Sequence, residues 1–283
     1  EDSIKIQELL TFIKRFNNSM LRDDALYELG NSYVKANETE KGMHVYDQLN
    51  SEYSQSTFVV KSMLHQGLIL YNQGKNELAL DKFKHITTLF KETPEAYQAI
   101  ASARLIYIDL GRVNEYATWV KTLGYIEVSN ADLDNATYEA AEKQYLDSNT
   151  EKAITQFNNY INQFANGLHA LQAHFYLAQL YYKKDLGSNA ASHYKYVVEA
   201  SQNEFTEEAL LRLSQFYLEG KNYNESMPLL LRLEKEANFP QNVVFAQSNL
   251  MKASYQLESY KNAVTYAEKV LTNSKLDNKI KAD

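Results

Sequence analysis

Apolar residues recur along this chain at steps of three and four, in short segments separated by brief polar turns. Residues at that spacing lie on one face of a helix. The clearest first set is Leu26, Leu29, Gly30 and Tyr33. After a polar turn, a second set follows at Gly42, Tyr46 and Leu49. The pattern predicts two antiparallel helices of about three to four turns, each roughly 20 Å long at about 1.5 Å per residue.

The same pattern returns at a steady interval. Small residues occur 36 to 38 positions apart, at Gly42, Ala79, Ala117, Ala153, Ala190, Ser226 and Ala263. An aromatic residue precedes each of them by eight to ten positions, at Tyr33, Tyr71, Tyr107, Tyr145, Tyr182, Tyr217 and Tyr255. A small residue lets the two helices of a hairpin cross closely, and the aromatic rings fill the wider gaps. Because a lone hairpin cannot bury both of its faces, neighbouring hairpins must stack.

This interval divides the chain into repeats. The expected units are a half-repeat at 1–20, hairpins at 21–55, 56–92, 93–130, 131–166, 167–203, 204–239 and 240–275, and the start of a truncated repeat at 276–283. We expect a single solenoid over residues 1–283 that is cut inside a repeat at each end, and hence a fragment of a longer protein. The third hairpin fits least well, because Arg104 and Trp119 stand near small-residue positions and residues 123–134 look irregular.

Composition agrees with helical repeats and excludes several functions. The chain has only 9 glycines and 3 prolines, and these residues are the main breakers of regular structure. Its formal net charge of −7 offers no basic stripe to neutralise phosphates, so we expect no nucleic-acid partner. The absence of cysteine excludes disulfides, thiolate metal sites and cysteine nucleophiles. No apolar stretch approaches the roughly 20 residues of a transmembrane helix.

The residues of the repeat resemble a known family. Leu29-Gly30-x-x-Tyr33 followed by Gly42 and Tyr46 is similar to the tetratricopeptide repeat. Further matches are Ala153-x-x-x-Phe157, Ala178-x-x-Tyr181 and Ala190-x-x-x-Tyr194. The resemblance implies an all-α fold, a right-handed superhelical solenoid of antiparallel hairpins. The chain departs from the family in its period of about 37 rather than 34 residues, and in lacking most of the helix-ending prolines.

A narrower resemblance concerns the first 30 residues. The stretch 12–19 leading into 24–30 looks like the longer-period repeats of bacterial cell-envelope proteins, such as outer-membrane assembly lipoproteins and the TolA-binding coordinator of the periplasm. It implies a periplasmic or outer-membrane-associated location in a bacterium, with the cytoplasm as the alternative.

Catalytic and metal-binding patterns are not evident. His169 and His174 are five residues apart, whereas two ligands on one helix face need three or four, so we interpret the six histidines as solvated or capping. Residues 67–75 lack the glycine spacing of a phosphate loop. No acid and base are placed around a shared pocket by any motif. We predict no enzyme activity, no cofactor and no metal.

The remaining candidates are polar and aromatic residues of the first helices, which line the concave face in tetratricopeptide proteins. They are Tyr27, Asn31, Tyr71, Arg104, Tyr107, Tyr138, Tyr145, Phe175, Gln179, Tyr182, Gln215, Lys252 and Tyr255. Tyrosine combines a large apolar ring with a polar tip, which suits a recognition surface. The alternative is that these rings pack between hairpins. In the chaperone-binding members a lysine and an asparagine hold a carboxylate, and Tyr27 stands where that lysine is needed.

These features favour a protein–protein interaction scaffold whose concave groove binds a peptide or helix of another protein. Two alternatives stay open. One is a glycan- or peptidoglycan-binding solenoid that stacks sugars on the tyrosines. The other is a regulatory sensor arm of a larger multidomain protein. The partner and the oligomeric state do not follow from the sequence.

Overall fold

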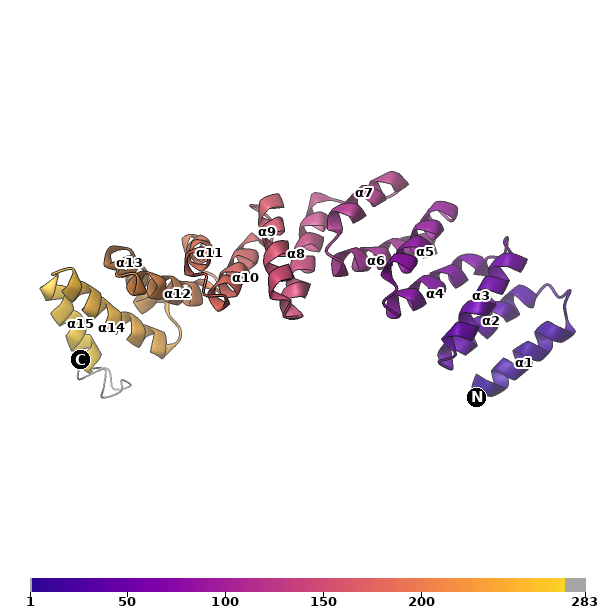
Figure 1. Ribbon diagram of the computed structural model, residues 1–283, viewed down its shortest axis with the longest axis horizontal. Coiled ribbons are helices and arrows are strands. Elements are labelled where there is room, and N and C mark those ends of the chain that lie inside the picture. The colour runs from indigo at the N-terminus through magenta and orange to yellow at the C-terminus, as the bar shows by residue number, and fades with distance from the viewer. Residues whose placement is uncertain (1, 273–283) are drawn as a thin grey trace. The chain divides into compact units, whose positions relative to one another are not determined.

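A computed structural model describes residues 2–272, and every regular element in that range is an α-helix (Figure 1). The predicted all-α fold is therefore confirmed for this part of the chain. The predicted start of a truncated repeat at 276–283 lies outside the described residues. Within 2–272 no helix has both the length and the apolar character that a membrane span needs.

The chain divides into two compact units between Ala140 and Ala141. The helices of the first unit are α1 (Asp2–Arg15), α2 (Arg22–Lys35), α3 (Thr39–Glu52), α4 (Phe58–Asn72), α5 (Asn76–Leu89), α6 (Pro94–Asp109), α7 (Val113–Leu123) and the first part of α8 (Asn130–Leu146). Helices α2 and α3 form a hairpin, as do α4 and α5, and α6 and α7, and each hairpin packs on the next. Of the stretch 123–134 that the sequence predicted to be irregular, residues 124–129 between α7 and α8 are not helical, whereas residues 130–134 belong to α8.

The second unit contains the rest of α8 and the helices α9 (Thr150–Gln163), α10 (Ala170–Lys183), α11 (Gly187–Glu199), α12 (Thr206–Glu219), α13 (Tyr223–Glu236), α14 (Pro240–Gln256) and α15 (Tyr260–Thr272). Here too the pairs α10–α11, α12–α13 and α14–α15 form hairpins that stack in chain order. Because the two units are separate bodies, a single solenoid over the whole chain stays a prediction.

The first helix of each hairpin ends in the same motif. In the second hairpin the Gly74 N–H donates to the Tyr71 carbonyl oxygen at 2.8 Å, and the Lys75 N–H donates to the Leu70 carbonyl oxygen at 2.9 Å. This pair of bonds is a Schellman motif, which requires a left-handed residue. Such residues have positive φ and recur every 36 or 37 positions, at Asn37, Gly74, Gly111, Ser148, Asp185, Lys221 and Glu258. We call each of them the register residue and count positions within a hairpin from it.

A small residue faces a large one where the two helices cross, at positions −7 and +9. A Cβ atom added to Gly30 would lie 2.4 Å from Tyr46 Cε1, and one added to Gly67 would lie 2.4 Å from Phe83 Cε1. The same positions hold the pairs Ala141–Phe157, Ala178–Tyr194 and Ser214–Leu230. The third and seventh hairpins depart from this order, with Arg104–Val120 and Met251–Ala267.

The third hairpin also corrects one part of the predicted small-residue series. Its equivalent of Gly42 and Ala79, five positions after the register residue, is Tyr116, and Ala117 lies one position later. Tyr116 is buried, with its ring centroid 6.0 Å from that of Tyr107 and 6.2 Å from that of Trp119. An aromatic cluster therefore replaces the small residue at this site.

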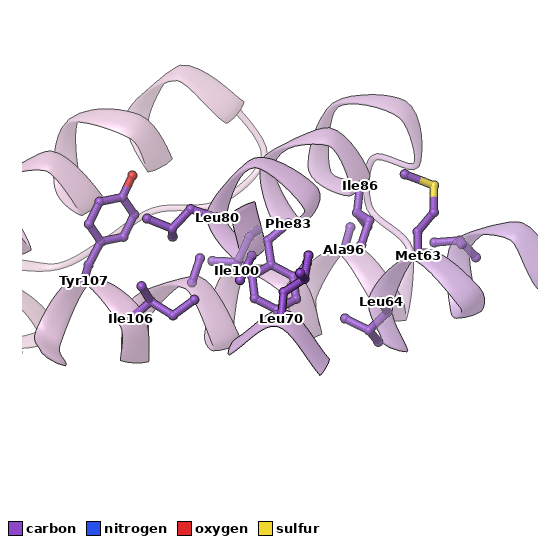
Figure 2. Close-up of a cluster of buried hydrophobic side chains, with 14 of the residues drawn as sticks. Met63, Leu64, Leu70, Leu80, Phe83, Ile86, Ala96, Ile100, Ile106 and Tyr107 are labelled. Atoms are coloured by element: carbon purple, nitrogen blue, oxygen red, sulfur yellow. The ribbon is translucent and has the colours of Figure 1, made fainter. Parts of the chain in front are cut away.

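Buried side chains of successive helices form the core of each unit. Figure 2 shows the cluster in the first unit, where Leu80 and Phe83 of α5 lie against Ile100, Ile106 and Tyr107 of α6. Phe83 and Ile106 are 0% exposed and Tyr107 is 1% exposed. Stacking is thus what completes the core of each hairpin, as expected for repeats that cannot bury both faces alone.

Two histidines occupy core positions in the fifth hairpin, which the sequence did not indicate. His174 and His193 stand at −11 and +8, where the first hairpin has the buried residues Leu26 and Val45. Their Nδ1 atoms are 2.9 Å apart, so one ring donates a hydrogen bond and the other accepts it. Tyr196 stacks on His174 with ring centroids 3.7 Å apart. The expectation that the histidines are solvated or capping is wrong for this pair, because α10 and α11 bring them together.

The close crossing in the second hairpin predicts a cost for Gly67→Ala. The added methyl group forces the Phe83 ring to move, which costs about 1–3 kcal/mol and is offset by the roughly 1 kcal/mol that alanine gains over glycine in a helix. Urea denaturation measures the difference. The cost is expected to shrink in a Phe83→Leu background, and an equal cost in both backgrounds would contradict the contact.

The histidine pair predicts a loss of stability in acid. Burial, together with the neighbouring His193, lowers the pKa of His174 to about 4, and burial also lowers the pKa of His193. The unfolded chain therefore binds more protons than the folded chain between about pH 6.5 and pH 4, so the free energy of unfolding falls as the pH drops through that window. After allowance for partial solvent access, we expect a loss of about 1–2 kcal/mol.

The matched variant is His174→Leu with His193→Val, which copies the residue types of the first hairpin at these positions. Thermal melts of both proteins between pH 7 and pH 4 isolate the contribution of the pair from that of the carboxylates. If the Tm values of the two proteins fall in parallel as the pH drops, the loss of stability does not come from the histidine pair.

Candidate functional site

The register places most of the candidate residues on the equivalent face of their own first helices. Positions −6 and −3 are three residues apart and therefore share a helix face. Asn31, Gln179, Gln215 and Lys252 stand at −6, and Tyr71, Tyr145, Tyr182 and Tyr255 stand at −3. We call the surface that these two positions form within each unit the first-helix face of that unit. The other candidates are Tyr27, Tyr138 and Phe175 at −10, Arg104 at −7 and Tyr107 at −4.

The aromatic series of the sequence therefore contains two kinds of tyrosine. Tyr33, Tyr107 and Tyr217 stand at −4, one residue before the others. Tyr107 belongs to the core, whereas Tyr182 and Tyr255 at −3 are 48% and 62% exposed. Tyr138 and Phe175 are also buried. A shift of one residue turns a helical side chain by about 100°, which separates the buried Tyr107 from the exposed Tyr182 and Tyr255.

In the first unit, the candidates contact one another and their neighbours. Tyr27 stacks on Phe58 with ring centroids 5.0 Å apart, and on His65 at 5.7 Å. The Tyr46 hydroxyl donates to Asn31 Oδ1 at 2.6 Å. Burial lowers the pKa of His65, which favours its neutral form inside this cluster. These contacts join α2, α3 and α4.

Two further candidates of the first unit form polar bridges between first helices. The Tyr71 hydroxyl donates to Asp109 Oδ2 at 2.7 Å, joining α4 to α6. Burial and the adjacent carboxylate raise the pKa of Tyr71 to about 12. Arg104 donates to Glu139 Oε2 at 3.1 Å, joining α6 to α8. In this unit the candidate side chains are therefore engaged in holding hairpins together.

In the second unit, the first-helix face is a connected row of aromatic and amide groups. The Tyr145 hydroxyl donates to Gln179 Oε1 at 2.9 Å, which joins α8 to α10. Arg212 lies 4.8 Å from the centroid of the Tyr182 ring and donates to the Tyr182 hydroxyl at 3.3 Å and to Gln215 Oε1 at 3.4 Å. The row thus runs from α8 over α10 to α12.

Arg212 was not among the candidates from the sequence. It sits at −9 and contacts Glu208 one turn earlier, with a nitrogen–oxygen distance of 2.7 Å. That pairing at four residues is visible in the sequence as an ordinary helix-surface ion pair. Only the fold shows that the same guanidinium covers the ring of Tyr182.

The row leads to a pocket of about 620 Å³ between the hairpins α12–α13 and α14–α15. Its lining contains two candidate residues, Lys252 and Tyr255, and the −3 residue of α12, Leu218. The other lining residues are Tyr223, Asn249, Met251, Gln256, Ala263, Val264 and Ala267. Ligand pockets of proteins have volumes of about 300–1,000 Å³, so the size suits a bound group.

A small residue at position +9 accounts for the space. The other hairpins carry a large buried side chain there, at Tyr46, Phe83, Val120, Phe157, Tyr194 and Leu230. The seventh hairpin has Ala267 instead, so the volume that the large side chain fills in the other hairpins is not filled here. Met251, opposite it at −7, is longer than the usual small residue but lines the pocket rather than closing it.

Metal-ligating side chains do not gather in groups of three or more within residues 2–272. In the fifth hairpin, the rings of His174 and His193 are hydrogen-bonded to each other. The first-helix face and its pocket are therefore the candidate functional site, and its groups are suited to binding through rings, amides and the cations Arg212 and Lys252.

Comparisons with known proteins identify the repeat in one hairpin. Residues 24–56 match the family described as tetratricopeptide repeat. This range covers α2 and α3, where Gly30 faces Tyr46. A search of the curated proteins gives no match.

Solved structures give weak similarities. A tetratricopeptide repeat protein from Parabacteroides merdae is 16% identical, with 85% of this chain and 89% of that chain covered and a TM-score of 0.38. The pilF protein of Pseudomonas aeruginosa is 9% identical, with 79% of this chain and 95% of that chain covered and a TM-score of 0.39. The C-terminal part of a tetratricopeptide repeat protein from Cytophaga hutchinsonii is 13% identical, with 90% of this chain and 97% of that chain covered and a TM-score of 0.40. Scores of this size assign no function.

The predicted tetratricopeptide relationship is thus supported by the match over the first hairpin, together with the all-helical hairpins of both units. The narrower cell-envelope type stays a prediction.

Proposed function

We propose that this chain is a non-enzymatic scaffold that binds a peptide or helix of a partner protein on the first-helix face of its second unit. The observation that carries the proposal is the row from Tyr145 through Gln179 and Tyr182 to Gln215, which ends in the pocket beside Tyr255. Proteins that contain tetratricopeptide repeats generally mediate protein–protein interactions.

The chemistry of the row suits a polypeptide. Tyr182 and Tyr255 present large rings that lose little side-chain entropy on binding. The amides of Gln179 and Gln215 each have donors and acceptors that can meet peptide groups of a partner. The row also crosses successive hairpins, so it offers a long track rather than one closed cavity.

The glycan alternative is less consistent with this geometry. Sugar recognition by stacking uses an open aromatic face. The guanidinium of Arg212 lies 4.8 Å from the Tyr182 ring centroid and covers one face of that ring. The Tyr145 ring stacks on Tyr176 with ring centroids 4.6 Å apart. Bacterial envelope location and a regulatory role within a larger protein stay predictions that this surface does not test.

The proposal predicts that changing Tyr145 and Tyr182 to Ala weakens capture of the partner protein by at least tenfold, because both rings contribute contact area along the row. Pull-down with the chain, followed by a binding titration with the recovered partner, measures the effect. Circular dichroism and thermal melts establish that the variant is folded.

Tyr97→Ala is the matched control, since its ring is 44% exposed and lies in the first unit, outside the row. Tyr182→Ala alone removes an exposed ring and keeps the test valid should the double variant unfold. Undiminished capture by the folded variants would remove these tyrosines from the site. Binding on a glycan array with no protein partner would overturn the scaffold proposal.

A further inference from the structure

We propose that the pocket between α12–α13 and α14–α15 binds an acidic, apolar segment of a partner protein, with an apolar side chain in the pocket and a neighbouring Asp or Glu paired with Lys252. This inference rests on the proposed scaffold function and names the partner's chemistry at one place on its surface. It follows from the shape, the charge and the surroundings of the pocket.

The shape favours an apolar side chain. Ala263, Val264 and Ala267 of α15 form one wall, and Leu218, Met251 and Tyr255 contribute further apolar surface. The missing volume at Ala267 corresponds to a ring or branched side chain in six other hairpins. A partner's Leu or Phe supplies the kind of group that the neighbouring hairpins supply from within.

The charge favours a carboxylate beside that group. The ten lining residues include one cation, Lys252, and no Asp or Glu, although the chain as a whole has a net charge of −7. Lys252 has no ion pair or hydrogen bond with any other side chain in the part of the chain that the structure describes. A lysine at the mouth of an apolar pocket gains most from an ionised partner, because charge-assisted bonds are the stronger ones.

The surroundings favour a segment of polypeptide over a small molecule. Leu218 and Tyr255 stand at −3, in line with Tyr182, so the pocket lies on the first-helix face proposed above as the binding surface. Val264 in the wall of the pocket is 58% exposed, so the apolar surface continues out of the pocket along α15. A partner segment that follows the row can therefore place one side chain in the pocket and continue beyond it.

The test is a selection from a random peptide display library against the intact immobilised chain. Selected peptides are expected to share a Leu, Ile or Phe next to an Asp or Glu. The strongest of them is then synthesised with a fluorescent label, and its Kd is measured by polarisation. Lys252→Glu is expected to weaken binding at least tenfold and to reverse the preference for acidic residues in a repeated selection.

Two matched variants separate the pocket from general surface charge. Lys261→Glu makes the same charge change on α15 outside the pocket lining, and we expect it to leave the Kd within twofold. Ala267→Leu fills the pocket with the residue type of Leu230, and we expect it to weaken binding at least tenfold without lowering the Tm. Unchanged binding by both Lys252→Glu and Ala267→Leu would overturn the proposal.

Two other occupants are outcomes of the same assay. A synthetic peptide of residues 273–283, added in trans, is expected not to compete with the selected peptide. Competition by that peptide would assign the pocket to the chain's own segment, and concentration-dependent dimerisation abolished by Ala267→Leu would assign it to a second copy. Either result overturns the partner assignment.

The outcome is distinguishable from failure of the scaffold proposal. Loss of partner capture by the Tyr145 and Tyr182 variants, with unchanged binding by the Lys252 and Ala267 variants, would retain the scaffold and reject the pocket's role. Binding that depends on Lys252 and Ala267 but not on the tyrosines would retain the pocket and reject the row.

Discussion

The close crossing of two helices within each hairpin is the constraint on which the rest of the structure depends. Where Gly30 meets Tyr46 and Gly67 meets Phe83, no space remains for a side chain on the first helix. The ring fills the crossing, and the next hairpin then covers the outer side of the same core. Interiors of this density respond to a change of a single methyl group, which accounts for the small residue facing a large one in five of the seven hairpins.

The hairpins that break this order are the informative ones. In the third, Arg104 replaces the small residue and reaches outward to Glu139, while Tyr116 and Trp119 form an aromatic cluster. In the seventh, Ala267 replaces the large residue and a pocket lies beside it. Under the proposed role of this pocket, the omission of one side chain from an otherwise regular core creates a binding site. In the other six hairpins the same position holds a buried side chain.

Much of the fold could be predicted from the sequence, because the helical period and the series of small residues are local signals. Whether each tyrosine stands at position −4 or −3 could not be predicted from the sequence. A difference of one residue decides that Tyr107 is buried and Tyr182 exposed. The pairing of His174 with His193 and the contact of Arg212 with Tyr182 depend on packing between helices. The pocket depends on an absent side chain, which becomes visible only when equivalent positions are aligned by the register residue.

The register residues have a further consequence for the evolution of the chain. Five of the seven, among them Lys221 and Glu258, are not glycine, although their φ values of 56° and 57° lie in the left-handed region. An L-residue in that conformation costs roughly 1–2 kcal/mol relative to the right-handed region, a penalty that glycine avoids. The hairpin turns therefore hold a reserve of conformational strain that single substitutions can release. A glycine substitution at one of these positions removes that penalty and offsets a destabilising change of similar size elsewhere in the hairpin.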